Sequence, residues 1–150
     1  MDVLETEKIY FSLEEVQLIL PKLEQPLKKL MKLKKSLEIY DLVDVEFEDE
    51  DYELHMKNIK INKQFHKLHY EFFKLLEEVE GTGAIITDLD LGLVDFYSQF
   101  EGKEIMLCWK LGEDKVRHWH DIFAGYGERK PIYFLGDELL KKQEVRAKKR

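Results

Sequence analysis

The sequence predicts an α+β protein: a long antiparallel helical hairpin packed on a small antiparallel β-sheet, followed by a C-terminal helix. Three observations predict this class. Residues 12–40 and 52–80 carry apolar side chains at the alternating three- and four-residue spacing of a helix stripe. From residue 84 the period changes to two, as in strands with one buried face. The length of 150 residues suits a single domain, residues 1–150.

The first predicted helix begins at a capping box. The Ser12 hydroxyl can accept a hydrogen bond from the backbone of Glu15, whose carboxylate can accept one from the backbone of Ser12. Pro21 and Pro26 each lack a backbone donor, so we expect them to kink or locally break this helix. The apolar stripe consists of Leu13, Val16, Leu20, Leu23, Leu27, Leu30 and Leu37.

The second predicted helix repeats this spacing, with Asn58 in one polar position. Each helix alone would leave its stripe in water, so we expect the two to pair as a hairpin. Residues 44–53 between them are crowded with mutually repelling carboxylates, which indicates a hairpin tip or a loose connector. A cation-binding loop is the alternative, although the Asp-x-Asp-x-Asp-Gly spacing of a calcium loop is missing. The stripe consists of Leu54, Ile61, Phe65, Leu68, Phe72, Leu75 and Val79.

Short strands are expected after the second helix ends at Gly81. Residues 84–87, 93–97 and 103–110 have the composition and alternation of strands, with turns between them. In the third strand, Ile105, Leu107 and Trp109 share one face, and Met106 and Cys108 share the other. The stretch 116–123 fits either a short helix or a fourth strand.

Composition and charge limit the classes of function. The formal net charge of −7 disfavours nucleic-acid binding by the body of the chain. The expected terminal helix, residues 137–150, is the exception, because six Lys or Arg outnumber three acidic residues there and could contact an anionic partner. No apolar run approaches the roughly 18 residues of a membrane span, and no signal-peptide pattern opens the chain, so we expect a cytoplasmic protein. The one cysteine, Cys108, excludes an intrachain disulfide.

A functional site is most strongly indicated at residues 87–95. Three carboxylates, Asp88, Asp90 and Asp95, lie within eight residues. In an extended chain Asp88 and Asp90 point the same way, and Gly92 would let the chain reverse and bring Asp95 near them. Carboxylates this close need a cation or a donor between them, so a divalent metal is a reasonable occupant.

The ligands decide which metal fits. Carboxylates alone suit magnesium, calcium or manganese, and adding His120 shifts the preference to manganese, iron or zinc. His118 and His120 share a face only if their segment is extended. Glu113 or His120 could act as ligand or general base, and Arg129 could hold an anionic substrate by paired hydrogen bonds.

A structural interpretation stays open for each of these residues. Aspartates before a glycine also cap backbone donors in tight turns. Asp95 could pair with Arg117 or Arg129 to hold the sheet together. His120 could be a half-buried histidine with satisfied hydrogen bonds, and Cys108 a small packing residue.

Motifs spread over about residues 10–132 form a larger pattern, namely Phe11-Ser-Leu-Glu-Glu with Leu20-Pro21, the run from Asp88 to Phe96, the run from Leu107 to Glu113, Trp119-His120, Gly125, Arg129 and Pro131. Together they resemble a prokaryotic uncharacterised family, the domain of unknown function 2203. The resemblance implies no established activity. His120 matches the family pattern and His118 does not, so the resemblance favours His120 as a ligand or acid–base group. The other matching candidates are Asp88, Asp90, Asp95, Glu113 and Arg129.

Two functions from different classes fit this sequence. The first is a binding or scaffold module, whose hairpin holds a protein partner or a second copy through an apolar stripe that the sheet leaves uncovered. The second is a small metal-dependent hydrolase with an Asp/Glu/His site. We favour the first, because no reaction is indicated: a phosphate-binding loop, a serine elbow and a paired Cys-x-x-Cys are all missing from the sequence.

Overall fold

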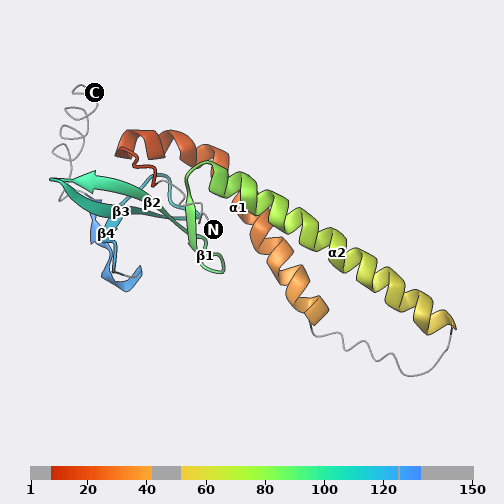
Figure 1. Ribbon diagram of the computed structural model, residues 1–150. Helices are drawn as coiled ribbons and strands as arrows, with labels where there is room; N and C mark the ends of the chain where they lie inside the picture. The colour runs from red at the N-terminus through yellow and green to blue at the C-terminus, as the bar shows by residue number, and fades with distance from the viewer. Residues whose placement is uncertain (1–7, 42–51, 125, 133–150) are drawn as a thin grey trace, which may run out of the picture.

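The computed structural model describes residues 8–41, 52–124 and 126–132 (Figure 1). Two long helices, α1 (Leu13–Asp41) and α2 (Tyr52–Gly81), pack on each other as a hairpin, and a five-stranded antiparallel sheet follows. The predicted α+β class, with a helical hairpin on a small sheet, is confirmed. No helix in these ranges combines the length and the apolarity that crossing a membrane requires.

Two predicted segments lie outside the described residues. They are the terminal helix, at 137–150, and most of the acidic connector, at 44–51. The structure therefore leaves both as predictions from the sequence.

The predicted capping box begins α1. Glu15 N donates a hydrogen bond to Ser12 Oγ, and Ser12 N donates one to Glu15 Oε1, each at 3.1 Å. The helix continues through Pro21 and Pro26 and changes direction over the segment that holds them (Figure 1). The two prolines thus bend the helix without breaking it.

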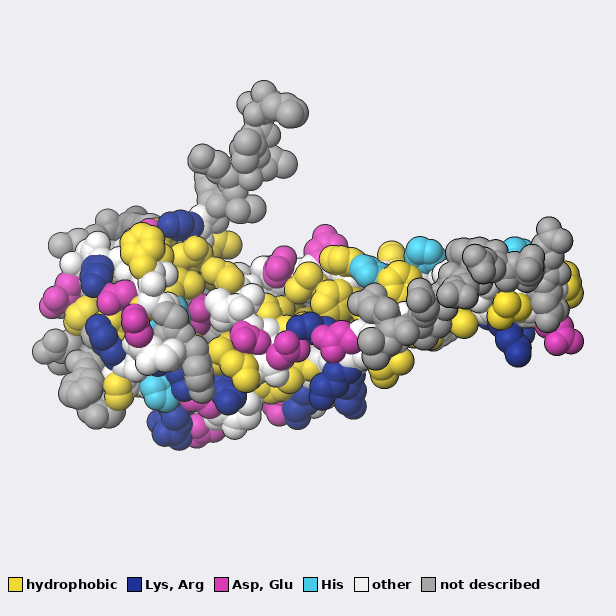
Figure 2. Space-filling model, turned by 90° about the horizontal axis from the view of Figure 1, so that it is seen from below, with side chains coloured by type: hydrophobic (Ala, Val, Ile, Leu, Met, Phe, Trp, Pro, Cys, Tyr) yellow, Lys and Arg dark blue, Asp and Glu magenta, His cyan; other side chains and the backbone are white. Residues whose placement is uncertain are grey.

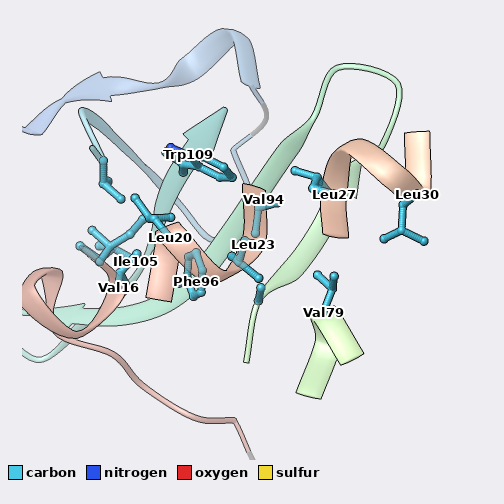
Figure 3. Close-up of a cluster of buried hydrophobic side chains, with 13 residues drawn as sticks. Val16, Leu20, Leu23, Leu27, Leu30, Val79, Val94, Phe96, Ile105 and Trp109 are labelled. Carbon is cyan, nitrogen blue, oxygen red and sulfur yellow. The ribbon is translucent and has the colours of Figure 1, made fainter. Parts of the chain in front are cut away.

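The hydrophobic core lies between α1 and one face of the sheet (Figure 3). Five stripe residues of α1 are buried there, and each buried leucine contributes about 1.5–3 kcal/mol. The second helix adds Val79 near its C-terminal end, and the rest of α2 extends beyond the sheet along α1 (Figure 1). The helix residues of the core are Val16, Leu20, Leu23, Leu27, Leu30 and Val79, and the sheet residues include Val94, Phe96, Ile105, Leu107 and Trp109.

The sheet is a simple meander in which each strand pairs with the next along the chain. The segment that the sequence left undecided, 116–123, contains the fourth strand and not a helix. In order, the strands are β1 (Ile85–Asp88), β2 (Leu93–Phe100), β3 (Lys103–Lys110), β4 (His118–Asp121) and β5 (Lys130–Pro131).

The register of the strands places polar side chains on the face of the sheet away from α1. Asp95 of β2 lies opposite Cys108 of β3, and Cys108 lies opposite His118 of β4. Because side chains alternate along a strand, these residues point away from the core that Phe96 and Leu107 enter. This outer face holds the candidate functional site.

Candidate metal centre

Three metal-ligating side chains from three strands converge on the outer face of the sheet. Asp95, Cys108 and His120 come from β2, β3 and β4, and they are 4%, 2% and 5% exposed. Each offers one ligand atom, and the three atoms lie within 4.8 Å of one another. We call these three buried side chains, which supply a carboxylate, a thiol and an imidazole, the Asp–Cys–His triad.

The hydrogen bonds of His120 fix the orientation of its ring. Nδ1 lies 2.8 Å from the backbone carbonyl oxygen of Asp121, and a carbonyl only accepts, so this nitrogen carries a proton. Nε2 lies 3.1 Å from Asp95 Oδ2. In a neutral ring Nε2 then presents a lone pair to a carboxylate oxygen, and the two repel unless a proton or a cation lies between them. A carbonyl that fixes Nδ1–H in this way is typical of metal-ligating histidines.

The second carboxylate oxygen of Asp95 is buried. Within the described part of the chain, Oδ1 has no hydrogen-bond partner. Leaving a buried polar group unsatisfied costs about 1–3 kcal/mol, and more when the group is charged. The carboxylate therefore has ligand capacity that the protein itself does not use.

The environment of Cys108 keeps its sulfur protonated. Burial raises the pKa of the thiol to about 12, and the charge of Asp95 and a hydrogen bond to it add to the rise, while Arg129 opposes it. A buried thiol gives up its proton when a metal ion replaces it. The sequence placed Cys108 on the strand face opposite Leu107 and Trp109 and interpreted it as a packing residue, without identifying Asp95 and His120 as its neighbours.

A second polar group lies beside the triad and contains two of the predicted catalytic candidates. Glu113 Oε1 accepts a hydrogen bond from Lys110 N at 2.8 Å and lies 3.5 Å from Arg129 Nη1. His118 Nδ1 lies 3.7 Å from Glu113 Oε2, beyond hydrogen-bond range. The structure thus brings Glu113 and Arg129 together. Of the two arginines considered for Asp95, Arg117 instead donates hydrogen bonds to Asp114.

The other two predicted ligands, Asp88 and Asp90, lie outside the triad. Asp88 Oδ1 accepts a hydrogen bond from Leu91 N at 3.1 Å, as a residue that caps a turn does. The side chain of Asp90 is 68% exposed and lies 2.8 Å from Lys34 Nζ. The extended conformation expected for residues 88–90 is wrong, because β1 ends at Asp88 and residues 89–92 form turns.

A cavity of about 280 Å³ opens beside the triad. All three triad residues line it, together with Thr87, Asp88 and others. Asp88 therefore faces the same space as the triad although it is not part of it. A small molecule or a water could reach the three ligand atoms from this side.

Comparisons with known proteins identify a family and no activity. A family model described as "Uncharacterized conserved protein (DUF2203)" matches residues 9–132, a range that contains the whole triad. No curated protein and no solved structure matches the chain. Because the family model covers well over half of the 150 residues, the chain belongs to the DUF2203 family of uncharacterized conserved proteins.

Proposed function

We propose that this protein is a binding module that holds one divalent transition-metal ion through Asp95, Cys108 and His120. The observation that supports the proposal most strongly is the contact between His120 Nε2 and Asp95 Oδ2 at 3.1 Å, with the Nδ1 proton held by a carbonyl. A metal ion bound by both groups replaces the repulsion of two acceptors with two coordinate bonds. The thiol of Cys108 supplies a third ligand from the strand between them.

The ligand set favours zinc or iron(II) over magnesium and calcium. A thiolate and an imidazole are soft and borderline ligands, whereas magnesium and calcium prefer oxygen. Around tetrahedral zinc, with bonds of about 2.0–2.3 Å, ligand atoms lie about 3.3–3.8 Å apart. The separations in the triad, all within 4.8 Å, need only small side-chain shifts to reach those values.

The test is the metal content of the purified protein and of three ligand variants. The full chain is prepared without chelator, loaded with zinc or iron(II) and freed of excess metal. We expect about one ion per wild-type chain and a loss of binding in Asp95→Asn, Cys108→Ser and His120→Gln. Circular dichroism shows whether each variant is folded.

His118→Gln is the matched control, because His118 lies two residues before His120 on the same face of β4. We expect it to bind metal like the wild type. Wild-type protein that retains no zinc or iron after loading would contradict the proposal, and so would ligand variants that retain as much metal as the wild type.

The cavity favours metal-dependent hydrolysis as a second candidate function. Three protein ligands leave one position of a tetrahedral metal for water, and bound zinc lowers the pKa of that water to about 7. The general base of such an enzyme cannot be His120, which is a ligand, and Glu113 is held by Lys110 and Arg129. Asp88, whose side chain lines the cavity, is the carboxylate left for this role. Metal-loaded protein is assayed against phosphoester, ester and peptide substrates. Asp88→Asn should lower turnover and retain the metal, and failure of the loaded wild type on all three classes would exclude these activities.

A further inference from the structure

The cavity beside the Asp–Cys–His triad has no basic side chain in its lining. Among the described residues that line it, none is Lys or Arg. Arg129 lies 3.5 Å from Glu113 Oε1 and is not part of the lining. Lys34 Nζ lies 2.8 Å from Asp90 Oδ1 and is not part of the lining either. An anion in this cavity would therefore lack a positive side chain to pair with.

Asp88 offers the cavity a carboxylate oxygen that the protein does not use. Its Oδ1 accepts the hydrogen bond from Leu91 N at 3.1 Å, and its Oδ2 has no hydrogen-bond partner among the described residues. Asp88 is partly buried and lines the cavity. A carboxylate that is partly withdrawn from water favours a hydrogen-bond donor, and most of all a donor with positive charge.

The hydroxyl group of Thr87 is a second acceptor in the lining. It donates its one proton to Leu93 O at 3.3 Å, so it can offer only lone pairs to a ligand. An ammonium group has three N–H donors and no acceptor, which complements the oxygens of Thr87 and Asp88. A carboxylate or phosphate would instead place acceptors against acceptors.

The rest of the lining is apolar and the space is small. Leu91, Leu93 and Ala124 form what we call the apolar wall. The volume of about 280 Å³ lies just below the roughly 300–1,000 Å³ of pockets that hold drug-sized ligands. A ligand that fits therefore combines a short hydrocarbon part with its donor group.

The proposed metal leaves the lining with one net negative charge. A divalent ion balances the carboxylate of Asp95 and the thiolate of Cys108, and the third ligand, His120, is neutral. The carboxylate of Asp88 is then uncompensated. On the face of the molecule seen in Figure 2, Lys and Arg side chains are interspersed with Asp and Glu side chains. The charge that selects a ligand is therefore the one within the cavity.

We propose that the cavity binds a small organic amine as its ammonium ion, with the nitrogen on Asp88 and Thr87 and the carbon chain on the apolar wall. The inference rests on the proposed function, because this ligand would occupy the open side of the metal site. While Asp88 pairs with an ammonium group it cannot act as a general base, so the inference belongs to the binding module and not to the hydrolase.

Three probes of similar size and different charge test the class of ligand. The zinc-loaded full chain is titrated at pH 7 with n-butylamine, n-butanol and butyrate, and the amide NMR signals of Thr87, Leu91 and Ala124 are followed. A primary amine is protonated at this pH, since such groups titrate near pH 10.4. We expect saturable shifts with butylammonium in the millimolar range, binding of butanol that is about tenfold weaker or more, and no binding of butyrate.

Two variants locate the ammonium group and the carbon chain. Asp88→Asn keeps an oxygen that can accept from Leu91 N and removes the charge, so it should weaken butylammonium binding about tenfold or more. Ala124→Leu adds bulk at the apolar wall and should abolish binding. Asp114→Asn is the matched control for Asp88, because it removes the same charge from an exposed carboxylate outside the lining, and it should bind like the wild type.

Zinc content in the same samples separates two kinds of failure. Protein that holds zinc and shows no shifts with butylammonium overturns this inference alone. Equal binding of butanol or butyrate overturns it as well, and so does an Asp88→Asn or Ala124→Leu variant that binds butylammonium like the wild type. Protein that holds no zinc contradicts the proposed function and this inference with it.

Discussion

Nε2 of His120 lies 3.1 Å from Oδ2 of Asp95, although β3 runs between the strands that carry them. Strands two apart in a sheet are separated by about 9.5 Å, so both side chains reach toward each other across the middle strand. Cys108 of β3 offers its sulfur to the same point. The outer face of the sheet thus brings three ligand types together, as the proposed metal site requires.

Replacing Asp95 should lower stability in the presence of metal but not in its absence. In chelator the Asp95→Asn variant removes a buried charge, so we expect urea stability within about 1 kcal/mol of the wild type, or higher. With zinc the wild type gains binding energy that the variant lacks, so the variant should be the less stable protein. Urea unfolding with and without zinc measures both differences.

A purely structural ion pair between Asp95 and an imidazolium His120 gives a different outcome. Removing one partner of a buried pair costs about 3–5 kcal/mol, with or without added metal. A loss of that size in chelator, together with no effect of zinc on the wild type, would support the ion pair over the metal site.

Local sequence signals predicted the helices and the central strands well. The capping box at Ser12 and the apolar stripes depend on residues three and four apart, so neighbouring residues carry the information. The four residues of β4 are too few for a period to emerge, which is why helix and strand stayed open there.

The candidate site was predicted only in part, because it depends on strand register. Asp95 and His120 were expected as ligands, and register brings them together. Asp90 was misplaced because the turn after β1 interrupts the extended chain that the argument assumed. A lone cysteine gives no local signal, so Cys108 becomes a candidate only when its cross-strand neighbour is known.

The turn between α2 and β1 should depend on Gly83. Its φ of +96° favours glycine, and a Cβ at this position would lie 2.3 Å from the Phe11 ring. Gly83→Ala should therefore lower the free energy of unfolding by about 1–3 kcal/mol. Gly81→Ala is the control, because a Cβ there meets nothing within 4 Å, and it should change stability by less than about 1 kcal/mol. Equal effects of the two substitutions in urea unfolding would argue against this description of the turn.

The contact between α1 and the sheet should carry most of the stability. Leu23 is 1% exposed in the centre of the core, so Leu23→Ala should cost about 2–5 kcal/mol in urea unfolding. Leu18→Ala, on the exposed side of the same helix, should cost less than about 0.5 kcal/mol beyond propensity effects. A small cost at Leu23 would mean that α1 does not pack on the sheet as described.

One surface ion pair makes a specific prediction about pH. Arg117 lowers the pKa of Asp114 from its usual value of 3.8, mainly through hydrogen bonds at 2.9 and 3.1 Å. Because the folded pKa lies below the unfolded one, the pair stabilises the fold above pH 3.8, and this contribution is lost as pH falls through the folded pKa. Carboxyl NMR titration should show a higher Asp114 pKa in Arg117→Gln, and an unchanged pKa would mean that the pair does not form in solution.

X-ray absorption at the zinc edge of the zinc-loaded full chain tests the central claim most directly. The account predicts one sulfur ligand at about 2.3 Å, with nitrogen and oxygen ligands at about 2.0–2.2 Å. The sulfur contribution should disappear in Cys108→Ser. A first shell of oxygen and nitrogen alone in the wild type, or a sulfur signal that persists without Cys108, would contradict the account.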